Sequence, residues 1–277
     1  MKEGSLREIQ LLMKAVTPIF IYGAPTNYQS MPELRGAPFR GQLRYWFRAL
    51  NPDLTKTDLE TRESHIFGST DVGSRVKITV KPSGIPLEIG NRYYLPHKIY
   101  PRSTPRDKRI FSKPAILEDS EFLMWLQCTN QSVQAPFIKA FLLWLNLGGV
   151  GFRARRGFGS LRVIDSRVPE LELEDQRLIE LLKQTKFSDG NQLIDHLQRV
   201  LSVVLPNTPL ISNAMANFPS SSGSASYPSF SDGKWSLLVC EKPFDTYEDA
   251  MKQFWRDNLR INGIKDDRAF GYARGGR

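Results

Sequence analysis

Short strand patterns alternate with helix patterns along the first 165 residues, and this order limits the folds open to the chain. The clearest strand is RVKITVK at residues 75–81, in which apolar residues alternate with basic and polar ones. The clearest helix is PFIKAFLLWLNLGG at residues 136–149, an apolar run that ends in glycine. Strands interleaved with helices predict an α+β fold. Further strands are expected at residues 9–16 and 160–165, and further helices at about 38–50 and 57–66.

The second half of the chain has a different composition, with a boundary expected near residues 166–170. Residues 169–205 predict two acidic amphipathic helices, and residues 234–241 predict a strand. Thr246 is the expected N-cap of a further helix. We therefore predict two tandem ferredoxin-like (RRM-like) modules with long inserted loops, residues 1–168 and residues 169–277.

The positive charge of the chain is gathered into three segments. The net charge of the 277 residues is +9, whereas residues 35–48, 92–113 and 151–162 together carry +14 and leave the rest at −5. Clustering of this kind is typical of a surface that binds a polyanion such as nucleic acid. The basic residues of the second segment that we expect to bind RNA are Lys98, Arg102, Arg106 and Arg109, in an extended arm or long hairpin.

In the helix expected at residues 38–50, Arg40, Arg44 and Arg48 recur every four residues and share one face. No acidic residue lies nearby in the sequence, and like charges at this spacing repel one another. An RNA bound to this face would relieve the repulsion, so these arginines and the preceding Arg35 are predicted RNA contacts. We expect Arg44→Ala to spare the melting temperature and Trp46→Ala, on the opposite face, to destabilise the fold.

The segment GGVGFRARRGFGSLR, residues 148–162, interleaves glycines with arginines and two phenylalanines. Glycines allow close approach of the backbone to a phosphate, arginines bind phosphates in a bidentate manner, and an aromatic ring can stack on a base. A match to the dinucleotide-binding pattern at residues 149–154 has the wrong context, because it follows a helix and leads towards a strand. The predicted RNA contacts in this segment are Gly149, Gly151, Arg153, Arg155, Arg156 and Phe158.

Signals for catalysis are weak. The three histidines, His65, His97 and His196, are scattered and form no metal-binding pattern, so we expect neither a metal nor another cofactor. Only His97 lies among basic residues, where acid–base cleavage of RNA is conceivable in principle. Cys128 and Cys240 are predicted to be reduced in a cytoplasmic protein, and no apolar run is long enough to span a membrane.

Two separated motifs, ELRGAPFRGQLRYWFRAL and GGVGFRARRGFGSL, together with TPIFIYGA and HIFGS, resemble the RAMP superfamily. Their combination most resembles the first RAMP subunit of the Cmr complex, the type III-B CRISPR effector. The resemblance covers about the first 165 residues. Later it continues only in outline, through AFGYARG close to Arg277, which predicts that the second module is incomplete.

The resemblance implies two tandem ferredoxin-like folds and a non-catalytic role beside neighbouring RAMP subunits. It also implies contact with guide RNA towards its 3′ end and help in capturing target RNA. Two alternatives stay open at this point. One is a metal-independent endoribonuclease that cleaves CRISPR repeats with His65 or His97 as base, and the other is a mononucleotide-binding protein that uses residues 149–154.

Overall fold

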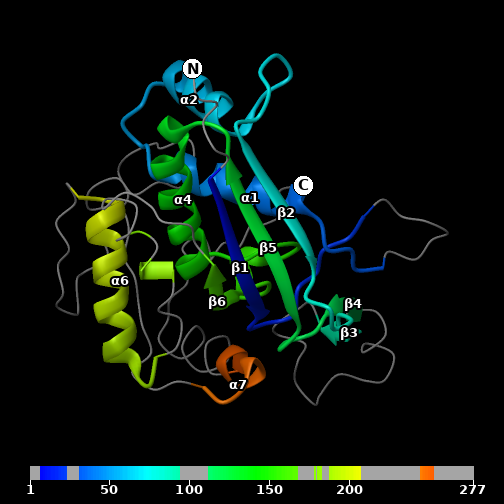
Figure 1. Ribbon diagram of the computed structural model, residues 1–277. Coiled ribbons are helices and arrows are strands. Elements are labelled where there is room, and N and C mark those ends of the chain that lie inside the picture. The colour runs from blue at the N-terminus through cyan, green and yellow to red at the C-terminus, as the bar shows by residue number, and fades with distance from the viewer. Residues whose placement is uncertain are drawn as a thin grey trace, which may run out of the picture.

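In the computed structural model, four strands form an antiparallel sheet at the centre of the molecule (Figure 1). The structure describes residues 7–23, 31–93, 112–167, 178, 180–182, 187–206 and 244–252. The strands lie side by side in the order β2 (Val76–Pro82), β5 (Glu121–Cys128), β1 (Arg7–Ala15) and β6 (Leu161–Arg167).

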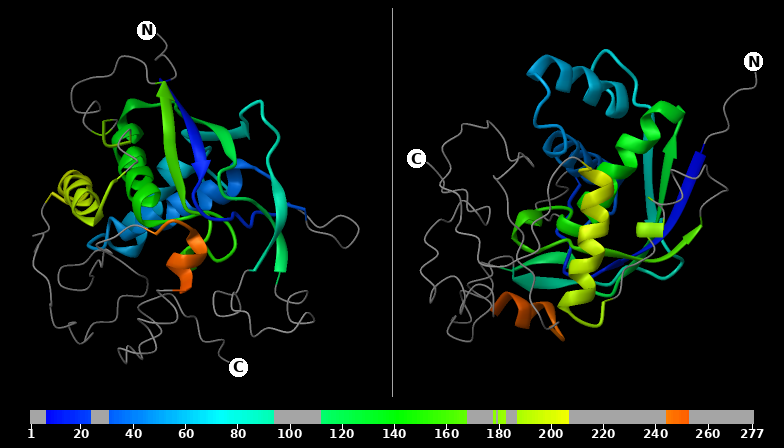
Figure 2. Two further views of the ribbon diagram at one scale, coloured as in Figure 1. Left: turned by 90° about the horizontal axis from the view of Figure 1, so that it is seen from below. Right: turned by 90° about the vertical axis from the view of Figure 1, so that its left-hand side faces the viewer.

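Two helices connect these strands and pack on one face of the sheet (Figure 2). Helix α1 (Gly36–Ala49) follows β1, and α4 (Gln134–Leu147) lies between β5 and β6. The order β1-α1-β2-β5-α4-β6 is the β-α-β-β-α-β pattern. Two insertions extend it, namely α2 (Lys56–Phe67) after α1 and a two-stranded sheet of β3 (Ile89–Tyr93) and β4 (Ser112–Ile116) between β2 and β5.

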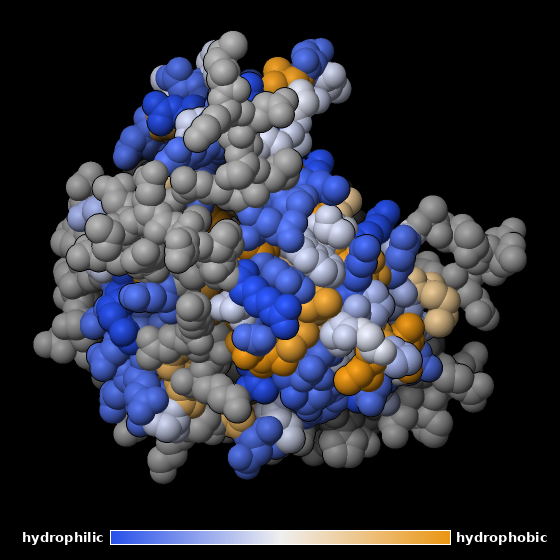
Figure 3. All heavy atoms as spheres, in the orientation of Figure 1, coloured by the Kyte–Doolittle hydropathy of each residue, from blue (hydrophilic) through white to orange (hydrophobic). Residues whose placement is uncertain are grey.

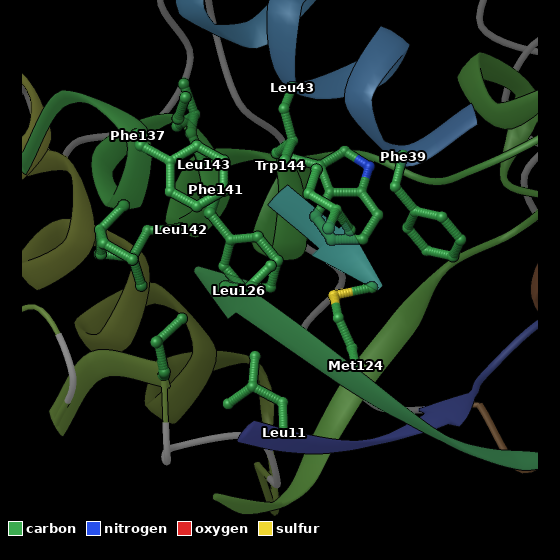
Figure 4. Close-up of a cluster of buried hydrophobic side chains, with 14 of the residues drawn as sticks. Leu11, Phe39, Leu43, Met124, Leu126, Phe137, Phe141, Leu142, Leu143 and Trp144 are labelled. Atoms are coloured by element: carbon green, nitrogen blue, oxygen red, sulfur yellow. The ribbon is translucent and has the colours of Figure 1, made fainter. Parts of the chain in front are cut away.

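The core lies between the sheet and these helices. Because side chains on a strand point to opposite faces in turn, every second residue of β5 is buried. Figure 4 shows Leu11, Met124 and Leu126 of the strands below the aromatic side chains of α4. Burying one such apolar side chain stabilises the fold by about 1.5–3 kcal/mol, so this layer holds the helices on the sheet. The aromatic residues of the layer that Figure 4 labels are Phe39, Phe137, Phe141 and Trp144.

The other face of the sheet is covered by none of the described helices, and it is the side seen in Figure 3. Hydrophilic residues predominate there, and hydrophobic ones form small groups. Lys81 and Trp125 lie on this face, with the ammonium group 5.9 Å from the ring centroid. This mixed surface suits a sheet with one solvated face.

The ends of α2 are set by local sequence. Thr55 precedes the helix, and its hydroxyl oxygen accepts a hydrogen bond from the backbone N–H of Asp58 at 3.2 Å. Gly68 follows the helix with φ +82°, and a Cβ at this position would lie 2.8 Å from the backbone nitrogen of Ser74. The helix therefore ends at a glycine, close to the end expected from the predicted range 57–66.

Helix α6 (Gly190–Val204) belongs to the second half of the chain but packs on α4, which lies between α6 and the sheet (Figure 2). His196 of α6 is fully buried, and its Nε2 lies 2.9 Å from Oδ1 of Asn146 on α4. Its ring also packs against Phe187 at a tilt of 43°, with centroids 5.0 Å apart. Burial, with a smaller effect of Arg199, lowers the pKa of His196 from 6.5 to about 4.

The structure confirms the mixed α and β character of the fold and the strands and helices predicted in the first 165 residues, but two strands were missed, of which β3 lies in the two-stranded sheet. The other, β5, lies in the middle of the central sheet. In the second half, α6 and the Thr246 cap of α7 (Tyr247–Lys252) are present, with the Thr246 hydroxyl accepting from the N–H of Asp249. The strand expected at 234–241 lies outside the described residues, so the second ferredoxin-like module stays a prediction.

Two further expectations concern the whole chain. Cys128 is buried and forms no disulfide, whereas Cys240 lies outside the described residues. Within the ranges that the structure describes, no helix is both long enough and apolar enough to cross a lipid bilayer.

The buried His196 predicts a pH dependence of stability. Folding lowers its pKa from 6.5 to about 4, so the unfolded chain binds more protons than the folded chain between these values. The free energy of unfolding should therefore fall as the pH drops below 6.5, by roughly 2 kcal/mol at pH 5 from this residue. Urea denaturation at several pH values gives the free energy of unfolding of the wild type and of His196→Gln. The contribution of His196 is the difference between the two proteins in how steeply this free energy changes with pH. Parallel pH profiles for the two proteins would contradict it.

Candidate nucleic-acid interface

The glycine-rich segment forms a tight loop between α4 and β6. It includes a 3₁₀ turn, η3 (Ala154–Arg156), and left-handed backbone at Arg153 with φ 63°. Gly151 has φ +89°, and a Cβ there would collide with the backbone of Phe20. Gly159 has φ +71°, and a Cβ there would collide with the backbone of Val150. The glycines thus allow the loop to pack closely against its own chain.

The loop is fixed to the segment that follows β1. The backbone N–H of Phe152 donates to the carbonyl of Phe20 at 2.8 Å, and the N–H of Gly159 donates to the carbonyl of Pro18 at 2.9 Å. The ring of Phe158 is fully buried and meets the ring of Phe20 edge to face, with centroids 5.3 Å apart. These contacts turn the ring of Phe158 inward and leave Phe152 44% exposed.

This geometry gives two of the predicted RNA contacts a role in packing. Phe158 is 0% exposed, so its ring is not available to stack on a base. Gly149 is buried, and a Cβ there would lie 2.5 Å from the carbonyl oxygen of Phe158, so its lack of a side chain serves packing within the loop. For Gly151 the close approach is likewise to the chain's own backbone. Its contact with RNA stays a prediction.

The two motifs that lie about 100 residues apart in the sequence meet in the structure. The guanidinium carbon of Arg155 lies 6.0 Å from the ring centroid of Tyr45 on α1. Trp46, the next residue, packs edge to face on Tyr45 and also reaches the start of the loop, where a Cβ on Gly148 would lie 2.7 Å from its Nε1. Helix α1 and the loop therefore form one continuous surface.

The arginine face of α1 differs from the prediction, because an acid does lie beside it. Glu63 of α2 is 4% exposed, and its carboxylate accepts from Nε of Arg44 at 2.6 Å and from Nη2 of Arg48 at 2.7 Å. Nη2 of Arg44 also donates to the carbonyl of Gly68 at 2.8 Å. Burial would raise the pKa of Glu63, but hydrogen bonds from Arg48 and Arg44 outweigh it and hold the pKa below its usual value. An external anion is therefore not the only partner open to these arginines.

The two remaining arginines near α1 are held to different degrees. Arg35 is exposed, and its Nη2 donates to the backbone carbonyl of Tyr22 at 2.9 Å. Arg40 is half-buried, and its Nε has no hydrogen-bond partner among the described residues. For Arg35 and for Arg40, contact with RNA stays a prediction.

The second basic segment begins and ends beside the loop. Tyr93 of β3 pairs with Ser112 of β4, so the two ends that flank residues 94–111 lie next to each other. The adjacent Lys113 has its Nζ 5.3 Å from the ring centroid of Phe152 and 6.0 Å from that of Tyr22. Arg92 of the same sheet pairs with Glu118 at 2.6 Å. The four predicted contacts of this segment, Lys98, Arg102, Arg106 and Arg109, lie outside the described residues.

We call the surface formed by Tyr45, Phe152, Arg153, Arg155 and Lys113 the loop surface. It combines three cations with two aromatic rings, and it draws them from α1, the glycine-rich loop and β4. Tyr45, Phe152 and Lys113 were not among the predicted contacts. Phe152 could have been found from its position beside Arg153, but the inward turn of Phe158 is a property of the folded loop. Such a surface can bind phosphates and stack on bases.

The histidines form no catalytic group in the described part of the chain. His196 is buried against Asn146 on the far side of α4 from the sheet, His65 is exposed on α2, and His97 lies outside the described residues. Among the described residues, no three His, Cys, Asp or Glu side chains are grouped so as to hold a metal ion.

The sequence matches the family model of the RAMP superfamily over residues 12–162, which run from within β1 to the start of β6 and include α1, β2, β5, α4 and the glycine-rich loop. This match covers more than half of the chain. The chain belongs to the RAMP superfamily.

Two curated relatives of this RAMP protein come from Pyrococcus furiosus. It is 32% identical over 178 residues to the CRISPR system Cmr subunit Cmr1-1, a match of 62% of this chain and 51% of that protein. It is 30% identical over 177 residues to Cmr subunit Cmr1-2, covering 54% of this chain and 92% of that protein. The chain thus spans about half the length of one relative and most of the other.

A solved structure supports the fold of this RAMP protein. A chain in the cryo-EM structure of the type III-B Cmr-beta complex bound to cognate target RNA aligns with a TM-score of 0.53 at 17% identity. The alignment covers 72% of this chain and 62% of that chain. At this identity the likeness establishes a common fold.

The ion-pair group of Glu63, Arg44 and Arg48 reverses the expected effect of Arg44→Ala. Arg44→Ala should lower the free energy of unfolding by about 1–2 kcal/mol, because Glu63 keeps Arg48 as a partner. Replacing Arg44 and Arg48 together should lower it by about 3–5 kcal/mol, more than the two single effects combined, because a buried carboxylate then loses both partners.

Urea denaturation of the single and double variants measures these changes. Arg62→Ala on the exposed side of α2 is the matched control and should leave the stability nearly unchanged. Additive effects of the two arginine changes would contradict the shared role of Glu63.

Proposed function

We propose that this chain is a non-catalytic, RNA-binding RAMP subunit of a type III-B CRISPR ribonucleoprotein in the cytoplasm. In this proposal it contacts guide RNA towards its 3′ end, helps to capture target RNA and lies beside neighbouring RAMP subunits. Residues 1–168 form the first of two tandem ferredoxin-like modules, and residues 169–277 contribute the second.

The observation that carries the proposal is the meeting of α1, β4 and the glycine-rich loop. Arg155 reaches Tyr45 of α1, and Lys113 of β4 reaches Phe152, so cationic and aromatic groups that are far apart in sequence share one surface. Alternating cations and rings are the means by which proteins bind single-stranded nucleic acid, because cations hold phosphates and rings stack on bases. The names of the two curated relatives, both Cmr subunits of a CRISPR system, support the same assignment.

The arginines do not all serve this surface. Arg44 and Arg48 are engaged by Glu63, and we assign them mainly to holding α2 on α1. Arg48 keeps a side-chain exposure of 48%, which leaves room for a further contact with a phosphate. Arg153, Arg155 and Arg156 of the loop are the main candidates for binding the RNA backbone.

Salt dependence tests the role of the loop arginines. If they bind phosphates of single-stranded RNA, the logarithm of affinity should fall linearly with the logarithm of salt concentration, with a slope of about −0.7 per phosphate neutralised. Changing Arg153, Arg155 and Arg156 to Ala should flatten the slope by roughly two units. Fluorescence anisotropy with labelled RNA over a range of salt concentrations provides the measurement.

Arg199→Ala is the control for net charge, because Arg199 is exposed on α6, on the other side of α4 from the sheet. It should leave the slope nearly unchanged. If the triple variant has the same salt slope as the wild type, the loop is not part of the RNA-binding surface.

The proposal also predicts that the purified chain leaves RNA intact. Cleavage without a metal needs a general base within reach of a 2′-hydroxyl, and His196 is buried away from the loop surface. Incubation with guide or target RNA, with and without magnesium, followed by gel electrophoresis is the test. Specific cleavage that disappears in His97→Ala would support the endoribonuclease alternative instead.

A further inference from the structure

We propose that Phe152 is a base-stacking residue, so that the RNA at the loop surface is single-stranded and has an unpaired base turned towards this ring. This inference rests on the proposed function and deepens it. It assigns the contact to the phenylalanine that the structure exposes, whereas the sequence had suggested Phe158.

The first argument is that the exposure of Phe152 is built into the loop. Its backbone N–H is fixed to the carbonyl of Phe20 at 2.8 Å, and the preceding Gly151 has a left-handed backbone packed on the same residue. The apolar cluster beneath is already filled by Phe20, Ala115 and Phe158, each at most 1% exposed. A second ring from the loop therefore has no place in this cluster, and Phe152 projects outward at 44% exposure.

The second argument is the position of the cations around this ring. Lys113 Nζ lies 5.3 Å from the ring centroid, and the guanidinium carbon of Arg153 lies 5.2 Å from it. One cation comes from β4 and the other from the loop, so the ring stands between two separate elements. Nε and Nη1 of Arg153 are buried, whereas Lys113 is exposed. A base that takes the place of Lys113 over the ring would therefore bring its phosphates within reach of the displaced ammonium group, which binds anions.

The third argument concerns the nucleic acid itself. Bases inside a double helix are stacked on one another and do not offer a free face to a side chain, whereas single-stranded RNA can turn a base outward onto an aromatic ring. Because phenylalanine has no hydrogen-bonding group, stacking on Phe152 reads no base edge. The contact should therefore favour single strands over duplexes without selecting a sequence.

A substitution series with the full chain tests the role of the ring. Phe152→Ala should weaken binding of single-stranded RNA about 10-fold to 100-fold, while the slope of affinity against salt concentration stays that of the wild type. Phe152→Trp should restore the affinity, because an indole ring also stacks. Ile85→Ala is the matched control, since Ile85 is another exposed apolar side chain, 67% exposed, on the connection from β2 to β3; it should bind as the wild type does.

An RNA with a single abasic nucleotide, placed in turn at each position, locates the base. At one position the missing base should weaken binding of the RNA to the wild type as much as Phe152→Ala weakens binding of the intact RNA. At that same position the missing base should not weaken binding to Phe152→Ala any further. If the abasic series and Phe152→Ala are additive at every position, the proposal is overturned and the ring contacts something other than a base.

The outcomes also separate this inference from the proposed function. Strong salt-dependent binding that is equal in the wild type and Phe152→Ala would overturn the stacking role and leave the proposed function standing. Absence of RNA binding by the wild-type chain would overturn both. Circular dichroism of each variant shows whether a loss of binding arises from unfolding.

Discussion

Trp144 is the side chain through which α4, α1 and the glycine-rich loop are held in one arrangement. Its indole is 1% exposed and packs against Phe39 of α1, with ring centroids 5.8 Å apart, and against Phe141 of its own helix at 5.3 Å. Its Nε1 donates to the carbonyl of Gly149 at 2.9 Å, at the point where the loop leaves the helix. The loop surface therefore depends on a buried ring that is not one of its five residues.

A separation of roles among the arginines follows from this arrangement. On α1, Arg44 and Arg48 share the carboxylate of Glu63, so one of their two charges is neutralised within the protein. In the loop, Arg153 and Arg155 lie against the rings of Phe152 and Tyr45 instead, and a cation over a ring keeps its charge. Net positive charge in a segment therefore indicates an affinity for anions only after the acids brought by other elements have been counted.

The sequence predicted those parts of the fold whose pattern is local. The alternation in β2 and the Thr246 cap of α7 are examples, because each depends on neighbours within a few residues. Strand β5 was missed because Leu123 and Trp125 of its outer face are as apolar as the buried Phe122 and Met124, which hides the alternation. Glu63 was missed because its partner Arg44 is 19 residues away, and only the packing of α2 on α1 brings the two together.

The two phenylalanines of the loop show why a site can be predicted in kind and still be assigned to the wrong residue. Both rings are flanked by glycines or arginines in the sequence, and nothing in the composition distinguishes them. The distinction comes from the backbone, because the left-handed residues at Gly157 and Gly159 turn Phe158 under the loop, while the hydrogen bond to Phe20 holds Phe152 above it. A buried ring stabilises the loop and an exposed one is available to a ligand, so the conformation of the glycines decides which phenylalanine can meet RNA.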